Sequence, residues 1–256
     1  MIEIIQIPAL SDNYIYLVHE PESRATAAID PAVAEPVLKA LDEMGWKLTH
    51  ILNTHHHYDH VAGNLELKRQ THCTIIGPGR DRERIPGIAV EVGEGDSVSL
   101  GHAQTQVLDV PGHTGGHIAY WFAEDDALFC GDTLFGMGCG RLFEGQPRQM
   151  WASLEKIRDL PPATRIYCAH EYTRANGRFA LTLEPDNLAL VARMARVNDL
   201  RSRGLPTVPS TLAEELATNP FLRPDNPAIR STLQMNNADD WQVFAEIRRL
   251  KDEFRG

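Results

Sequence analysis

The hydrophobic pattern of the chain changes character near residue 170. Before that point, short runs rich in β-branched and aromatic residues alternate with helix-like segments and turn signals. The runs that predict strands are 2–7, 14–18, 25–29, 49–53, 73–76, 105–110, 118–122, 127–130 and 164–168. Apolar residues at helical spacing predict helices over 37–44, 61–70 and 151–160. Many strands with a few helices predict an α/β sandwich of two sheets with helices packed outside.

The rest of the chain is predicted to be mostly helical. Apolar residues recur at i, i+3 and i+4 over 188–200 and 241–254, and the joining segments are rich in proline. We therefore predict an α/β domain over residues 1–173 and a small helical domain over residues 174–256.

Charge and histidine content divide the chain in the same way. Residues 1–170 hold 13 Lys/Arg against 23 Asp/Glu, so they carry the whole net charge of −10. All 11 histidines lie at or before His170, which concentrates imidazole chemistry in the first part. Nucleic-acid binding usually needs a basic stripe, so this acidic chain is not expected to bind DNA or RNA.

The sequence also indicates the cellular compartment that we expect for the protein. No apolar stretch approaches the roughly 18 residues needed to cross a membrane, and the N-terminus lacks a basic segment typical of a signal peptide. The four cysteines lie far apart without a C-x-x-C pair, which favours free thiols in a reducing compartment. We expect a cytoplasmic monomer that does not bind membranes.

One short segment concentrates ligand-type side chains. His55 and His57 lie two residues apart at the end of a predicted strand, so they point to the same side and can converge on one ion. Asp59 and His60 follow a bend and can face a second ion nearby. His56 should point away, and we assign it no metal role. Imidazole and carboxylate are typical ligands for zinc, iron and manganese.

Three more ligand-type residues follow predicted strands. They are His113, Asp132 and His170, each just past a strand's C-terminal end. Any one of these histidines alone, like His117, would be read as a capping or hydrogen-bonded core residue. Together with the cluster at 55–60 they indicate a two-metal site, because so many buried ionisable groups would be costly without an ion.

The remaining histidines keep a structural interpretation; they are His19, His50, His72 and His102. Asp30 follows the predicted strand 25–29 and has two open interpretations. It can accept the free N–H of a ligand histidine, or it can be a simple turn aspartate.

These residues resemble the ligand set of the metallo-β-lactamase superfamily, whose fold is an αβ/βα sandwich. A closer resemblance is to the glyoxalase II (hydroxyacylglutathione hydrolase) family. Its motifs correspond to residues 54–60, 131–135, 138–145, 168–173 and 209–215. The last motif lies in the helical part, which is typical of glyoxalase II and absent from most of the superfamily.

The resemblance implies a ligand partition between two divalent ions, most simply zinc, with iron or manganese as alternatives. His55, His57 and His113 would hold one ion. Asp59, His60 and His170 would hold the other, and Asp132 would bridge both. Asp59 and Asp132 would be catalytic, together with a metal-bound hydroxide.

The resemblance also implies that the helical domain binds glutathione. Arg141, Phe143, Tyr172, Arg248 and Lys251 would contact the substrate. Some family members have Lys and Tyr in place of Arg141 and Phe143, so a side-chain hydroxyl is missing here. From spacing alone, Arg248 and Lys251 would be a solvated helix surface; the resemblance reverses that preference.

The expected reaction is hydrolysis of S-(2-hydroxyacyl)glutathione, such as S-D-lactoylglutathione, to glutathione and a 2-hydroxy acid. This is the second step of methylglyoxal detoxification. Alternatives on the same scaffold are lactone or β-lactam hydrolysis and an iron-dependent persulfide dioxygenase. The complete second ligand set argues against the dioxygenase, which uses a single iron. A catalytically silent metal-binding or scaffolding protein is a further alternative.

Overall fold

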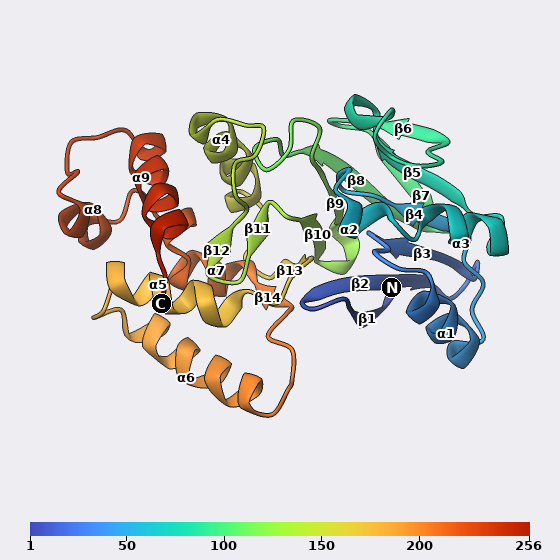
Figure 1. Cartoon of the computed structure of the whole chain (residues 1–256), viewed down its shortest axis with the longest axis horizontal. Coiled ribbons are helices and arrows are strands. Elements are labelled where there is room, and N and C mark those ends of the chain that lie inside the picture. Colours follow the sequence, from blue (N-terminus) through green and yellow to red (C-terminus); the bar gives the residue numbers. More distant parts are fainter. The chain divides into compact units, whose positions relative to one another are not determined.

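The computed structural model describes residues 1–256 and contains two compact units (Figure 1). The first unit consists of Met1–Val110 and Gly115–Gly131, and the second of Pro111–Thr114 and Asp132–Gly256. These units are defined by compactness, whereas the domains expected from the sequence are defined by function. The boundary at 173/174 therefore stays a prediction.

A six-stranded mixed sheet forms the first half of the chain. Its strands follow sequence order: β1 (Glu3–Ala9), β2 (Asn13–Glu20), β3 (Ala25–Ile29), β4 (His50–Leu52), β5 (Thr74–Pro78) and β6 (Val90–Val92). The first three pair antiparallel, and β3 to β6 pair parallel. The switch to parallel pairing follows from the helical connections, since a parallel neighbour needs a long crossover.

The second six-stranded sheet has the order β14-β13-β10-β9-β8-β7. Within the first unit, β7 (Ser97–Leu100), β8 (Ala103–Asp109), β9 (Ile118–Phe122) and β10 (Ala127–Gly131) form an antiparallel ladder. Within the second unit, β13 (Arg165–Cys168) pairs antiparallel with the short β14 (Ser210–Thr211), and β11 (Leu134–Phe135) pairs with β12 (Gly138–Cys139).

Alternating side chains of the first sheet pack against helices on one face and against the second sheet on the other. On one face, Ile15 and Leu17 of β2 pack in a core with Leu41 of α1 (Glu35–Met44) and Leu67 of α3 (Asn64–Thr71). On the other face, the ring of Tyr16 meets Phe129 of β10 edge-on at 5.4 Å. Figure 1 shows α1 beside this sheet. The predicted arrangement of two sheets with helices outside is confirmed.

Helices dominate the second unit, and its residues 174–256 are mostly helical, as predicted. Its helices are α4 (Pro147–Arg158), α5 (Thr173–Leu183), α6 (Leu188–Ser202), α7 (Leu212–Thr218), α8 (Pro227–Leu233) and α9 (Asp240–Glu253). Helices α5 and α6 pack together through Ala180, Leu190, Met194 and Val197, with Met137 completing the cluster. No helix of the chain has both the length and the apolar character that a membrane span requires.

The structure differs from the expected elements where local packing overrides periodicity. The helix predicted over 61–70 is two helices, α2 (Tyr58–Val61) and α3, separated around Gly63. A Cβ on Gly63 would lie 2.6 Å from the carbonyl oxygen of Pro31, so the backbone there fits only glycine. Strands β6, β7, β11, β12 and β14 and helices α7 and α8 were not predicted, because their runs are short. The 11-residue helix α5 was not predicted either.

Candidate metal centre

The histidine segment lies just beyond strand β4. That strand ends at Leu52, and His55 to His57 have no regular secondary structure before α2 begins at Tyr58. The rings of His55 and His57 nevertheless converge, with centroids 4.8 Å apart. Asp59 and His60 lie on the single turn of α2, so the bend expected between the two pairs is a helical turn.

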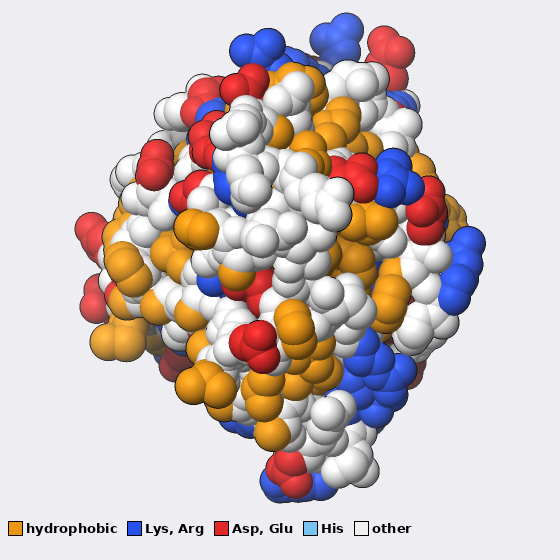
Figure 2. Space-filling view, turned by 90° about the vertical axis from the view of Figure 1, so that its left-hand side faces the viewer, with side chains coloured by type: hydrophobic (Ala, Val, Ile, Leu, Met, Phe, Trp, Pro, Cys, Tyr) orange, Lys and Arg blue, Asp and Glu red, His pale blue; other side chains and the backbone are white.

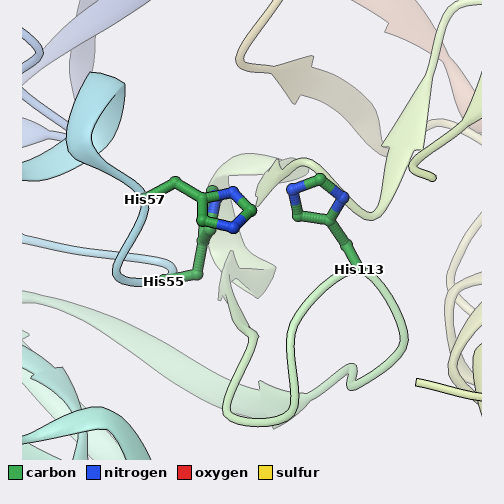
Figure 3. A group of neighbouring side chains, drawn as sticks. All are labelled: His55, His57 and His113. Atoms are coloured by element: carbon green, nitrogen blue, oxygen red, sulfur yellow. The ribbon is translucent and has the colours of Figure 1, made fainter. Parts of the chain in front are cut away.

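Three groups of side chains have ligand atoms within 4.8 Å of one another. They are His55, His57 and His113; Asp30, His55 and His60; and Asp59, His60 and His170. Figure 3 shows the three side chains of the first group. The first and third groups hold the residues that the resemblance assigns to the two ions, without Asp132.

Asp30 orients the buried His60. Its Oδ2 lies 3.1 Å from Nδ1 of His60, and the same carboxylate accepts hydrogen bonds from the backbone N–H of Thr54 at 2.7 Å and its hydroxyl at 2.6 Å. A carboxylate only accepts, so Nδ1 carries the proton and Nε2 presents its lone pair as a ligand atom. Asp30 has φ of 47°, yet it is more than a turn aspartate.

In the second unit, Asp132 lies between two histidines. Its Oδ2 is 3.3 Å from Nε2 of His113, and its Oδ1 is 3.3 Å from Nε2 of His170. The carbonyl oxygen of Arg141 lies 2.9 Å from Nδ1 of His113, so that nitrogen is the donor and Nε2 the ligand atom. One carboxylate oxygen per histidine is the arrangement expected of a bridging ligand.

The donor set fits borderline first-row metals. His55 and His60 are fully buried and His113, Asp132 and His170 nearly so, and burying so many ionisable groups is costly unless they are paired or bind ions. None of the four cysteines belongs to the ligand groups. Imidazole and carboxylate without thiolate fit zinc, iron or manganese, and do not select one of them.

Buried thiols next to this region are chemically quiet. Burial raises the pKa of Cys139 to about 11 and that of Cys168 to about 12. Because the thiolate is the reactive form of cysteine, both thiols are protonated and unreactive near neutral pH.

Three of the predicted substrate residues lie beside ligand histidines. The ring of Phe143 meets that of His113 edge-on at 5.2 Å, and the guanidinium of Arg141 lies 5.5 Å from the Phe143 ring centre. Tyr172 stacks on His170 with ring centres 4.9 Å apart. The side chains of Arg141 and Phe143 are exposed, so they are available to a ligand.

The two predicted contacts on α9 differ from each other. Arg248 is buried; it donates to the carbonyl oxygen of Cys139 at 2.9 Å and to Asp252 at 2.7 Å. It is therefore not the solvated surface residue that spacing alone favoured. The Lys251 ammonium lies 5.8 Å from the ring centre of Phe179 and 5.4 Å from that of Phe254. Partial burial, together with repulsion from Arg248, lowers the pKa of Lys251.

Other side chains support the ligand segment and were missed or left open by sequence reasoning. His56 points to Asp81, with Nδ1 3.0 Å from Oδ2, and is absent from the ligand groups. His117 stacks on His55 at 4.5 Å. Asn13 donates from its side-chain amide to Asp59. In the sequence, Asn13 gave only a turn signal, because its partner lies 46 residues away.

Figure 2 shows basic side chains in several places on the face drawn, with the widest blue area at its lower right. Other Lys and Arg side chains stand in separate places among acidic and hydrophobic ones.

Two family models match consecutive parts of the chain. Residues 15–170 match the model described as the metallo-beta-lactamase superfamily. Residues 171–254 match the model described as the hydroxyacylglutathione hydrolase C-terminus.

Individual relatives agree with these matches. Hydroxyacylglutathione hydrolase of Methylococcus capsulatus is 63% identical over 256 residues, with 100% of each chain covered. Among solved structures, ETHE1 from Myxococcus xanthus is similar with a TM-score of 0.67 and 25% identity, over 97% of this chain and 96% of that one. TTHA1623, solved in a di-iron-bound form, has a TM-score of 0.62 and 26% identity, over 86% and 99% of the two chains.

Proposed function

Because the chain belongs to the hydroxyacylglutathione hydrolase family of the metallo-β-lactamase superfamily, we propose that it hydrolyses S-(2-hydroxyacyl)glutathione thioesters. S-D-lactoylglutathione is the proposed substrate, and glutathione and D-lactate are the products. The reaction is the second step of methylglyoxal detoxification.

The position of Asp132 between His113 and His170 is the observation that carries this proposal. Two ligand groups joined by one carboxylate are what a binuclear hydrolase needs. We assign His55, His57 and His113 to one ion, Asp59, His60 and His170 to the other, and Asp132 to both. The di-iron form of TTHA1623 supports a binuclear site.

Two divalent ions in this site, zinc in the simplest case, would supply Lewis acidity and lower the pKa of a water molecule. The chain's own residues orient the reactants. Asp59 is partly exposed, with 38% of its side chain accessible, so its carboxylate can accept a hydrogen bond from the attacking water. Asp132 would present one carboxylate oxygen beside Nε2 of His113 and the other beside Nε2 of His170, as a ligand shared by both ions requires. A thiolate is a good leaving group, so no dedicated general acid is required.

Glutathione recognition is assigned to exposed cationic and aromatic side chains. Arg141 can pair with a carboxylate of the peptide, and Phe143 and Tyr172 offer ring faces beside the ligand histidines. Phe143 lacks a hydroxyl, so it contributes apolar contact alone. Lys251 adds a second cation. Arg248 donates a hydrogen bond to the carbonyl oxygen of Cys139 and so stabilises the segment that leads to Arg141.

We also propose that the protein acts as a monomer in the cytoplasm. Support for the compartment comes from the four cysteines, which are all buried and form no disulfide, as suits a reducing compartment. Gel filtration of the purified protein at working concentration tests the oligomeric state.

A substrate panel separates this function from its alternatives. The purified, metal-analysed protein should be assayed with S-D-lactoylglutathione, a lactone, a β-lactam and glutathione persulfide. Thioester hydrolysis at the highest kcat/KM supports the proposal, whereas preferred turnover of another substrate refutes it. A metal-loaded protein that turns over none of them would be the silent metal-binding protein.

A further inference from the structure

Asn13 is a buried amide that faces a ligand-type carboxylate. It is 5% exposed and begins strand β2, directly after the tight turn that joins β1 to β2. Its Nδ2 donates to the backbone oxygen of Asp59 at 3.2 Å and to Oδ2 of the same residue at 3.0 Å. Both acceptors are oxygens that cannot donate, so the assignment of the amide nitrogen is chemically fixed.

Both hydrogen bonds go to the same residue, Asp59, one to its backbone and one to its side chain. Asp59 lies on the one-turn helix α2, and part of its side chain is open to solvent. A carboxylate in such a position would sample several rotamers, which weakens its action as a ligand. Because Asn13 holds both the backbone and the carboxylate, the Asp59 side chain keeps one direction. In that direction its Oδ2 is 3.6 Å from Nε2 of His60.

The strand itself has no need of this side chain. Asn13 pairs with Ala9 through the backbone ladder, and many residue types can start a strand. A buried position favours an apolar side chain over an amide unless the amide has a hydrogen-bond partner. The partner here is a residue assigned to the second ion.

We propose that Asn13 is a positioning residue, which orients Asp59 so that Asp59 and His60 can bind the same ion. This inference rests on the two-ion site of the proposed function. It predicts that loss of the Asn13 amide weakens the binding of one ion and leaves the binding of the ion assigned to His55, His57 and His113 unchanged. Ligand-supporting residues typically change metal affinity by about 10- to 100-fold when mutated.

Two substitutions and one control test the idea. Asn13→Leu keeps the size of the side chain without its donors, and Asn13→Ala removes both. Gln6→Ala is the matched control, because Gln6 is an amide on the same hairpin whose Nε2 lies 3.5 Å from the Tyr16 hydroxyl rather than near a ligand. The two stepwise zinc dissociation constants of the full chain, stripped of metal, are measured by competition with a chromophoric chelator. Thermal melting of the stripped proteins monitors the fold.

The expected result is that wild type and Gln6→Ala bind two zinc ions. Both Asn13 variants should bind the first ion normally and the second about 10- to 100-fold more weakly. Two outcomes would overturn the inference about Asn13 and leave the two-ion site untouched. One is that both dissociation constants are unchanged in both variants, and the other is that the binding of both ions weakens equally while the melting temperature falls. A wild-type protein that binds only one ion would instead refute the two-ion site on which the inference rests.

Discussion

The carboxylate of Asp30 lies 3.1 Å from Nδ1 of His60, at the end of strand β3. Through the backbone N–H and hydroxyl of Thr54 it also holds the start of the segment that carries four proposed ligands. One side chain thereby fixes both the tautomer of a histidine and the path of the chain leading to it. The geometry of this part of the site is therefore built by residues that do not themselves need to touch an ion.

Replacement of Asp30 should lower metal affinity more than it lowers stability. In Asp30→Asn one accepting carboxylate oxygen becomes an amide nitrogen, which can only donate, so the side chain no longer accepts from Thr54 and His60 with both of its terminal atoms. We expect metal affinity to fall about 10- to 100-fold, with kcat falling in proportion. Chelator competition and steady-state kinetics on the same preparation measure both.

Asp126→Asn is the control for Asp30. Asp126 is an exposed turn aspartate with a similar positive φ, 49° against 47°. It should behave as wild type. If Asp30→Asn also behaved as wild type, Asp30 would be a turn residue only.

The sequence points to the candidate ligands more readily than to the residues that support them. His55, His57, Asp59 and His60 stand together in one segment, so residue type and spacing single them out as candidates, and their role as ligands stays a prediction. Asp30, Asn13 and Asp81 reach that segment from other strands and loops, and single side chains far away along the chain give no periodic signal. The elements showed the same split: the five-residue run 25–29, which is buried throughout, was located correctly. The short edge strand β6 has too few residues to show a pattern.

Arg248 shows a second limit of sequence reasoning. Its spacing from Lys251 places both residues on one helical face, and this is compatible with solvent or with a ligand. Only the fold reveals that the guanidinium reaches the carbonyl of Cys139, 109 residues earlier in the chain. Periodicity identifies a face, but the identity of what covers the face depends on tertiary packing.

Removal of the bridging carboxylate should abolish most activity. Asp132→Ala removes both carboxylate oxygens, of which Oδ2 lies 3.3 Å from Nε2 of His113 and Oδ1 lies 3.3 Å from Nε2 of His170. We expect kcat/KM to fall at least about 100-fold and metal content to drop below that of wild type. Kinetics with elemental analysis measure this. Asp159→Ala, at an exposed helix end, is the control; comparable activity in the two variants would argue against a bridging role.

The cation on α9 should affect substrate binding alone. Lys251→Ala is expected to raise KM for the glutathione thioester about 3- to 10-fold with kcat nearly unchanged, as for loss of one partly screened ion pair. Arg249→Ala is the control on the same helix, because Arg249 is exposed and pairs with Glu246 and Glu253. An unchanged KM in Lys251→Ala would remove this residue from the binding site.

Arg248→Ala should instead have a cost in stability. It leaves the Cys139 carbonyl without its donor, which lowers the free energy of unfolding by about 1–3 kcal/mol. Chemical denaturation measures that value. A double variant of Arg248 and Lys251 would mix the two effects, so the single variants are the informative ones.

The buried thiols should resist alkylation in the native protein. With the pKa of Cys139 at about 11 and that of Cys168 at about 12, the reactive thiolate is scarce at pH 8, and it becomes appreciable only as the pH rises toward those values. Iodoacetamide at pH 8 should label neither residue, as followed by mass spectrometry, and should leave activity intact. Rapid labelling of either cysteine before unfolding would show that its environment is more open than the fold implies.

The most direct test of the account is kcat/KM for S-D-lactoylglutathione, measured on the full-length protein together with its metal content. The account predicts two metal ions per chain and efficient thioester hydrolysis, lost on chelation and restored by zinc, iron or manganese. A folded protein that carries two ions and does not hydrolyse the thioester, or one that hydrolyses it without metal, would contradict the account.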